Sequence, residues 1–108
     1  MDGDTLKVDG KSYRLTIDGS DSFDTPETYR AKCLAEKLLG EKATDRLRGL
    51  LAGGYEVRDL GKTDRFGRSL WSVSVGGENI GEILIREGLA MPLINCPRCK
   101  RVGPGWCD

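Results

Sequence analysis

Residues 24–27, Asp-Thr-Pro-Glu, place two carboxylates and a hydroxyl around a proline, and Arg14 lies ten residues before them. A proline fixes its own φ and favours an extended conformation for the residue before it, so the two carboxylates are held on a stiff bend. Charge placed this rigidly suits a metal site or a site that activates water. The same four residues also suit the beginning of a helix, with the threonine as N-cap and the proline at the first helical position.

The composition limits the chemistry that such a bend can perform. The 108 residues contain 17 lysines and arginines, 17 aspartates and glutamates, and no histidine. Without histidine the chain lacks the commonest general base, so catalysis would depend on carboxylates, arginines, hydroxyls or thiols. The balanced charge gives no overall attraction to nucleic acid, and any binding of phosphates must come from local clusters of basic residues.

Length and hydropathy predict one soluble globular domain with a modest core. Hydrophobic residues make up 38% of the chain and charged residues 31%, which is typical of a folded protein rather than a disordered one. No apolar run is long enough to cross a membrane. Residues 1–5 are polar and acidic, so they do not resemble a signal peptide.

The pattern of apolar residues predicts the elements that would position the bend. Residues 4–17 alternate around an Asp-Gly turn at 9–10 and predict a hairpin. Residues 18–23 are turn-forming and predict a loop, whose regularly spaced aspartates could share a cation or form a solvated acidic surface. From residue 27 to 52 the spacing is helical, and Gly40 is expected to separate a short first helix or irregular turn from the main helix.

The second half of the chain predicts strands, one helix and a tail. The expected strands span residues 55–60, 70–75 and 91–94, with a charged turn at 61–68. Asn79 can cap a helix that ends near Gly88. Short antiparallel strands interrupted by a helix predict an α+β fold, mainly β, such as the five-stranded oligonucleotide-binding barrel.

Three further motifs accompany the bend at residues 24–27. Asp-Gly-Asp-Thr at 2–5 opens the hairpin, Asp-Arg-Phe-Gly-Arg stands at 64–68, and Gly-Leu-Ala stands at 88–90. In this order the four motifs resemble the staphylococcal nuclease-like family, the thermonucleases, over residues 2–92. The resemblance implies an oligonucleotide-binding barrel and calcium-dependent hydrolysis of phosphodiester bonds in DNA and RNA.

The resemblance also implies a metal site. Asp4 and Asp24 would be carboxylate ligands of one divalent cation, Ca2+, and Thr25 would supply its backbone carbonyl. Asp2 would support the site from behind these ligands. Such a set fits a hard cation, which prefers oxygen ligands and keeps several waters.

The family's catalytic residues correspond to Glu27, Arg14 and Arg68. Glu27 would be the general base that orients or deprotonates the attacking water, a reasonable role in a chain without histidine. Arg14 and Arg68 would hold the phosphate and its transition state, because the planar guanidinium matches phosphate oxygens. Taken singly, each of these residues also has an ordinary structural explanation, Arg68 as an exposed arginine at the end of a strand.

Two other functions stay open. A non-catalytic binding module on the same barrel would use Arg14, Arg65 and Arg68 for phosphate contacts. The family normally has a full strand before Asp2, so the barrel is expected to lack its first strand, and a truncated structural form could dimerise through the open edge. The loop before Asp24 is longer than in the family, which could move this aspartate away from the opening turn.

The chain contains four cysteines, Cys33, Cys96, Cys99 and Cys107. Zinc binding by four thiolates, two disulfides and free thiols are all open. Family members often keep one cysteine after Pro-Glu and another in a C-terminal Gly-Trp-Cys, which favours Cys33 with Cys107 and leaves Cys96 with Cys99. Disulfides would favour a secreted or periplasmic location. Residues 1–95 are expected to form the nuclease-like domain, with residues 96–108 packed on it as a cysteine-rich tail.

Overall fold

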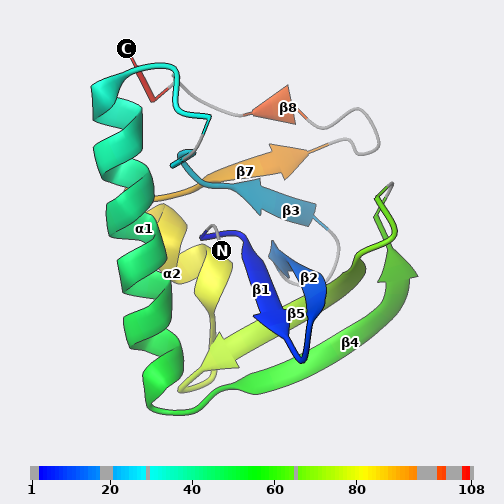
Figure 1. Cartoon of the computed structure of the whole chain (residues 1–108). Coiled ribbons are helices and arrows are strands. Elements are labelled where there is room, and N and C mark those ends of the chain that lie inside the picture. The colour runs from blue at the N-terminus through cyan, green and yellow to red at the C-terminus, as the bar shows by residue number, and fades with distance from the viewer. Residues whose placement is uncertain are drawn as a thin grey trace.

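The computed structural model describes residues 3–17, 21–28, 30–64, 66–94, 100–101 and 106–107 (Figure 1). Within these residues the chain forms an eight-stranded sheet and two helices. In chain order these are β1 (Thr5–Val8), β2 (Lys11–Ile17), β3 (Asp21–Asp24), α1 (Leu34–Ala52), β4 (Glu56–Thr63), β5 (Ser69–Val75), β6 (Glu78–Asn79), α2 (Ile80–Arg86), β7 (Met91–Ile94) and β8 (Lys100–Arg101).

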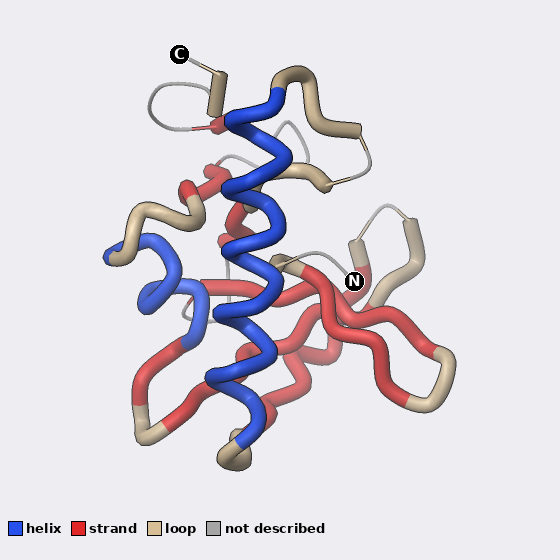
Figure 2. Tube along the Cα trace, turned by 60° about the vertical axis from the view of Figure 1, so that its left-hand side comes forward, coloured by secondary structure: helices blue, strands red, loops and turns tan. Residues whose placement is uncertain are grey.

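The strands form one mixed sheet in the order β4-β5-β2-β3-β7-β8, with β1 added to β2 and β6 added to β5. The pairing of β2 with β5 is parallel and the other pairings are antiparallel. Helix α1 runs across the strands on one side of the molecule (Figures 1 and 2). The predicted α+β class is therefore confirmed, and the described strands form an open sheet rather than a closed barrel.

The hairpin predicted for residues 4–17 is confirmed. Strands β1 and β2 are antiparallel, with Thr5 opposite Arg14 and Leu6 opposite Tyr13. Asp9 and Gly10 both have positive φ, 52° and 81°. Two successive residues with positive φ form the tight turn whose twist matches that of the flanking strands.

The loop predicted for residues 18–23 is wrong at its end, because residues 21–24 form strand β3. This strand lies between β2 and β7, with Ser22 opposite Thr16 on β2 and opposite Leu93 on β7. Phe23 is fully buried in the core. A central strand with one large apolar side chain among polar neighbours has too little alternation to be identified from its residue types.

The helix predicted from residue 27 begins later than expected. It starts at Leu34, and the sulfur of Cys33 accepts the N–H of Glu36 at 3.4 Å, so Thr25 is not the N-cap. Gly40 lies inside the continuous helix instead of ending a first one. A Cβ at this position would lie 2.7 Å from the carbonyl oxygen of Glu27, so the glycine is needed where the bend packs on the helix.

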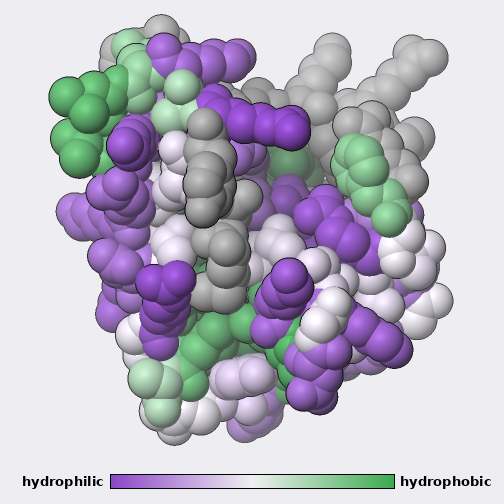
Figure 3. Space-filling view, viewed as in Figure 1, coloured by the Kyte–Doolittle hydropathy of each residue, from purple (hydrophilic) through white to green (hydrophobic). Residues whose placement is uncertain are grey.

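The core lies between the sheet and the helices. It consists of Leu6, Leu15, Phe23, Ala43, Leu47, Val73, Ile80, Leu84, Leu89 and Ala90. Two leucines in the first turns of α1 lie outside this core: Leu34 is 70% exposed and Leu38 is 56% exposed. The space-filling view shows an apolar patch beside the end of α1 that carries these two leucines (Figure 3).

The second half follows the prediction closely. Asn79 caps α2 by accepting the N–H of Glu82 at 3.2 Å, and its amide donates to the carbonyl of Thr16 at 2.9 Å. Gly88 has a φ of 76° just after the helix. The predicted strands at 55–60, 70–75 and 91–94 correspond to β4, β5 and β7. The turn predicted for residues 61–68 is wrong at its beginning, because β4 continues to Thr63, and the short strand β6 was not predicted. No helix within the described ranges is both long and apolar enough to span a membrane.

Two distant parts of the chain meet at the beginning of α1. Cys33 forms a disulfide with Cys107 across 74 residues, and Trp106 beside it is buried. Cys96 and Cys99 lie outside the described residues. Dimerisation through an open edge and a secreted or periplasmic location stay predictions, because the fold of one chain tests neither.

Candidate functional site

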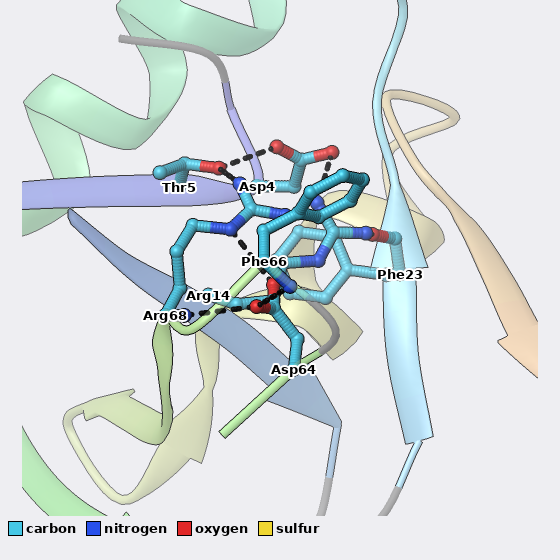
Figure 4. A network of polar contacts seen from close by, with 7 residues as sticks. All are labelled: Asp4, Thr5, Arg14, Phe23, Asp64, Phe66 and Arg68. Atoms are coloured by element: carbon cyan, nitrogen blue, oxygen red, sulfur yellow. Dashed lines mark hydrogen bonds and ion pairs between the residues drawn. The ribbon is translucent and has the colours of Figure 1, made fainter. Parts of the chain in front are cut away.

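The hairpin brings Asp4 and Arg14 together. Thr5 is opposite Arg14 in the β1–β2 register, and the N–H of Leu15 donates to the carbonyl of Asp4 at 3.0 Å. Nη1 of Arg14 lies 2.8 Å from Oδ2 of Asp4 (Figure 4). The side chains are only 12% and 10% exposed, so removing either charge would leave the other buried and unpaired.

Arg14 also links the hairpin to the strand that carries Asp24. Its Nη2 donates to the carbonyl oxygen of Phe23 at 2.6 Å. Phe23 is the neighbour of Asp24 on β3, which ends with that aspartate. The guanidinium therefore lies between the predicted ligand Asp4 and the backbone next to the second predicted ligand.

The opening turn and the bend at residues 24–27 pack against each other. A Cβ on Gly3 would lie 3.0 Å from Cγ2 of Thr25 and 3.3 Å from Cβ of Ala43. A Cβ at this position would press on both side chains, so the glycine lets the two segments pack closely. The segment with Asp4 and the segment with Asp24 therefore lie side by side where Gly3 meets Thr25.

Arg68 is fixed by the turn that begins at Asp64. Oδ2 of Asp64 accepts Nε of Arg68 at 2.7 Å, and Oδ1 accepts the backbone N–H groups of Phe66 and Arg68 at 2.9 Å each. Burial alone would raise the pKa of Asp64, but the hydrogen bonds from Arg68 and Phe66 outweigh it and hold this pKa below its ordinary value. The guanidinium of Arg68 lies 5.5 Å from the centre of the exposed Phe66 ring.

Thr5 joins the two arginines into one network. Its hydroxyl donates to Oδ1 of Asp4 at 3.0 Å and accepts from Nη1 of Arg68 at 3.3 Å. Asp4, Arg14 and Arg68, which the motifs predicted as site residues, are therefore connected through a residue that was not predicted to take part (Figure 4). Its position directly after Asp4 on a hairpin strand is a weak signal, because only the tertiary fold brings Arg68 to it.

Glu36 holds the bend that carries Glu27. Its carboxylate accepts the backbone N–H of Glu27 at 3.0 Å and that of Lys32 at 3.0 Å. Glu36 is only 4% exposed, so these two bonds compensate part of the cost of burying its carboxylate. Glu36 was not predicted to take part in the site, because its only local signal is its position in the helical pattern of residues 27–52.

The residues fit a hard cation in their chemistry. Within the described ranges no three histidine, cysteine, aspartate or glutamate side chains gather as a metal cluster. The predicted set needs only two carboxylates and a carbonyl, with waters for the rest. Oγ1 of Thr25 is buried and has no hydrogen-bond partner in the described part of the chain, so the bend holds an oxygen that the protein does not satisfy. Asp4, however, is paired with Arg14 in this structure, and a cation would share its carboxylate with that arginine.

Two predicted residues cannot be placed. Asp2, expected behind the metal ligands, and Arg65, expected in phosphate binding, lie outside the described residues.

Comparisons with known proteins agree with the motifs. Residues 21–101 match the family model described as staphylococcal nuclease homologue. The chain is 36% identical over 105 residues to the thermonuclease of Staphylococcus hyicus, which covers 93% of this chain and 59% of the relative.

Two proteins of Bacillus subtilis (strain 168) are similar to the chain as well. The SPbeta prophage-derived endonuclease YokF is 36% identical over 95 residues, covering 83% of this chain and 31% of the relative. Endonuclease YncB is 36% identical over 93 residues, covering 83% of this chain and 43% of the relative. The chain thus spans between 31% and 59% of the length of these curated relatives. Because the family model matches residues 21–101 of the 108, the chain belongs to the family of staphylococcal nuclease homologues.

Proposed function

We propose that this chain hydrolyses phosphodiester bonds of DNA or RNA as a calcium-dependent nuclease. The observation that carries the proposal is the network in which Arg14 and Arg68 meet around Asp4 and Thr5, in a chain whose three relatives described above are named as nucleases. Two guanidinium groups linked to one buried carboxylate, Arg14 directly and Arg68 through Thr5, suit the binding of a phosphate beside a cation. Phosphoryl transfer depends mainly on such positioning and charge neutralisation.

Asp4, Asp24 and the carbonyl of Thr25 would hold the calcium ion. When bound, the ion would neutralise charge on the phosphate and lower the pKa of a coordinated water. The packing of Gly3 against Thr25 supports this assignment, because it keeps the two ligand-bearing segments together.

Glu27 would act as the general base. Its backbone is fixed by Glu36 and rests on Gly40, so the carboxylate projects from a supported segment. The side chain would take a proton from the attacking water at its carboxylate oxygen. A general base contributes about 10²–10⁴-fold in rate.

Arg14 and Arg68 would bind the nonbridging oxygens of the scissile phosphate. Both guanidinium groups keep N–H donors beyond those that bond Asp4, the Phe23 carbonyl, Asp64 and Thr5. Charge on these oxygens grows toward the transition state, so the arginines would stabilise it more than the ground state.

The direct test is cleavage of fluorescent single-stranded DNA and RNA in calcium and in a chelator. We expect product only with calcium, and we expect Glu27→Gln to lower kcat by at least about a hundredfold while oligonucleotide binding and the melting temperature stay near wild type. Glu41→Gln, on the exposed face of α1, is the matched control and should cleave normally.

Two results would contradict the proposal. Normal turnover by Glu27→Gln would remove Glu27 from the role of base. Binding of the oligonucleotide in calcium without any product would favour the non-catalytic binding module, in which the same arginines only contact phosphates.

A further inference from the structure

Arg68 is held at two of its three guanidinium nitrogens by residues that have no role in the predicted site. Its Nε donates to Asp64 at 2.7 Å and its Nη1 donates to Thr5 at 3.3 Å. Within the described residues Nη2 donates no hydrogen bond. We propose that Asp64 and Thr5 are positioning residues that fix Arg68 with its Nη2 edge toward the phosphate, a proposal that rests on the proposed nuclease function.

Asp64 fixes both the backbone and the side chain of Arg68. One carboxylate oxygen accepts the backbone N–H groups of Phe66 and Arg68, and the other accepts Nε. The backbone closes the same turn, since the N–H of Asp64 donates to the carbonyl of Arg68 at 2.8 Å and the N–H of Gly67 donates to the carbonyl of Asp64 at 3.0 Å. One carboxylate therefore anchors both the backbone N–H and the guanidinium group of Arg68.

Thr5 holds the guanidinium from the other side. A hydroxyl has one hydrogen and two lone pairs, and here the hydrogen goes to Asp4 while a lone pair accepts from Arg68. The same group thus sets the position of a predicted metal ligand and of Arg68. The two parts of the site that must face the phosphate together are connected by one side chain.

Fixing Arg68 in place would help catalysis as well as the stability of the fold. An unrestrained arginine side chain samples many rotamers, and a phosphate that binds it must order the chain at a cost in free energy. An arginine already fixed in place contributes its charge to the transition state without that reorganisation. Asp64 and Thr5 would therefore act on the reaction through Arg68.

The test uses two variants that remove the contacts and keep the shapes. Asp64→Asn keeps Oδ1 for the two backbone N–H groups but replaces Oδ2 with an amide NH2 that cannot accept from Nε. Thr5→Val removes the hydroxyl. Asp59→Asn is the matched control, because Oδ1 of Asp59 accepts the N–H of Gly61 at 2.8 Å at an irregular stretch of β4.

Both variants should lower kcat about 10–100-fold on the single-stranded DNA substrate in calcium, with little change in KM, as the loss of an indirect positioning contact does in other sites. The control should stay within about twofold of wild type. In an Arg68→Ala background, Asp64→Asn should not lower kcat further, because a residue that acts only through Arg68 loses its effect when Arg68 is absent. Thr5→Val should lose the part of its effect that acts through Arg68 and keep only the part that acts through its bond to Asp4. Equal losses with and without Arg68 would overturn the proposal.

A second readout does not depend on activity. In ¹⁵N-labelled protein, the Nε–H resonance of Arg68 should exchange slowly with water in the wild type and at least about tenfold faster in Asp64→Asn, as expected when a bonded N–H is released. If the wild type cleaves neither DNA nor RNA in calcium, the proposed function fails and this resonance alone decides the positioning claim. Exchange that is unchanged in Asp64→Asn overturns the claim even in an active enzyme.

Discussion

Each of the two arginines in the site has its own aspartate. Arg14 is paired with Asp4 at 2.8 Å and Arg68 with Asp64 at 2.7 Å. The aspartates offset part of the positive charge, but they fix both guanidinium groups before any phosphate arrives. At the scale of single residues, the site is organised by these pairs and by the hydroxyl of Thr5 between them.

The ion pair between Asp64 and Arg68 should make the free energy of unfolding depend on pH. Because the pKa of Asp64 is lower in the folded protein than its ordinary value, the ionised carboxylate stabilises the fold above that value, and this contribution is lost as the pH falls through the folded pKa. We expect wild type to have a higher free energy of unfolding in urea than Asp64→Asn. This difference should be constant near neutral pH and should shrink below about pH 4. A difference that stays the same down to about pH 2.5 would contradict the shifted pKa.

At the scale of elements, helix α1 supports the bend that carries the proposed base. Glu36 accepts the N–H of Glu27, and Gly40 leaves room for the carbonyl groups of Pro26 and Glu27. The site therefore depends on a helix that contributes none of its predicted ligands.

Gly40→Ala tests this support. Its Cβ would lie 2.7 Å from the carbonyl oxygen of Glu27 and 2.8 Å from that of Pro26, so the bend or the helix must move. We expect a loss of about 1–3 kcal/mol in the free energy of unfolding and a lower kcat.

Gly49→Ala in the same helix is the matched control. Among the described residues, no atom beyond Gly49, its two neighbours and the surrounding helix backbone lies within 4 Å of its would-be Cβ, so the alanine should stabilise the helix by about 0.5–1 kcal/mol. If denaturant unfolding shows that both alanines stabilise, Gly40 is not a packing glycine.

Sequence patterns predicted those structural elements that depend on only a few neighbouring residues. The Asp-Gly turn of the first hairpin and the Asn79 cap of α2 follow from a few neighbouring residues, and both are present. Strand β3 and the role of Gly40 were missed, because Phe23 and Gly40 are explained by contacts with distant segments.

The same division applies to the site. The motifs identified Asp4, Arg14 and Arg68, and the structure connects them. The bond between Thr5 and Arg68 joins β1 to the turn before β5, and residue spacing cannot predict a contact between such distant segments.

At the scale of the whole molecule, the disulfide between Cys33 and Cys107 joins the beginning of α1 to the C-terminal part of the chain. It closes a loop across 74 residues. A crosslink of this length restricts the unfolded chain strongly, which in the chain-entropy model stabilises a protein by about 4 kcal/mol.

Cys107→Ser should therefore lower the free energy of unfolding by up to about 4 kcal/mol in urea. Cys33→Ser is the companion variant, because a serine still caps α1 while the crosslink is lost. Similar losses in both variants would assign the effect to the crosslink, and wild-type stability of Cys107→Ser would contradict it.

The central claim is that the opening turn and the bend at residues 24–27 hold one calcium ion beside the two arginines. Calorimetric titration of calcium into the wild type, Asp24→Asn and Asp45→Asn measures this directly. Asp45 is the control because its side chain is 77% exposed on α1. We expect one ion per chain in the wild type and the control, and binding more than about tenfold weaker in Asp24→Asn. No binding by the wild type, or equal affinity in all three proteins, would contradict the account.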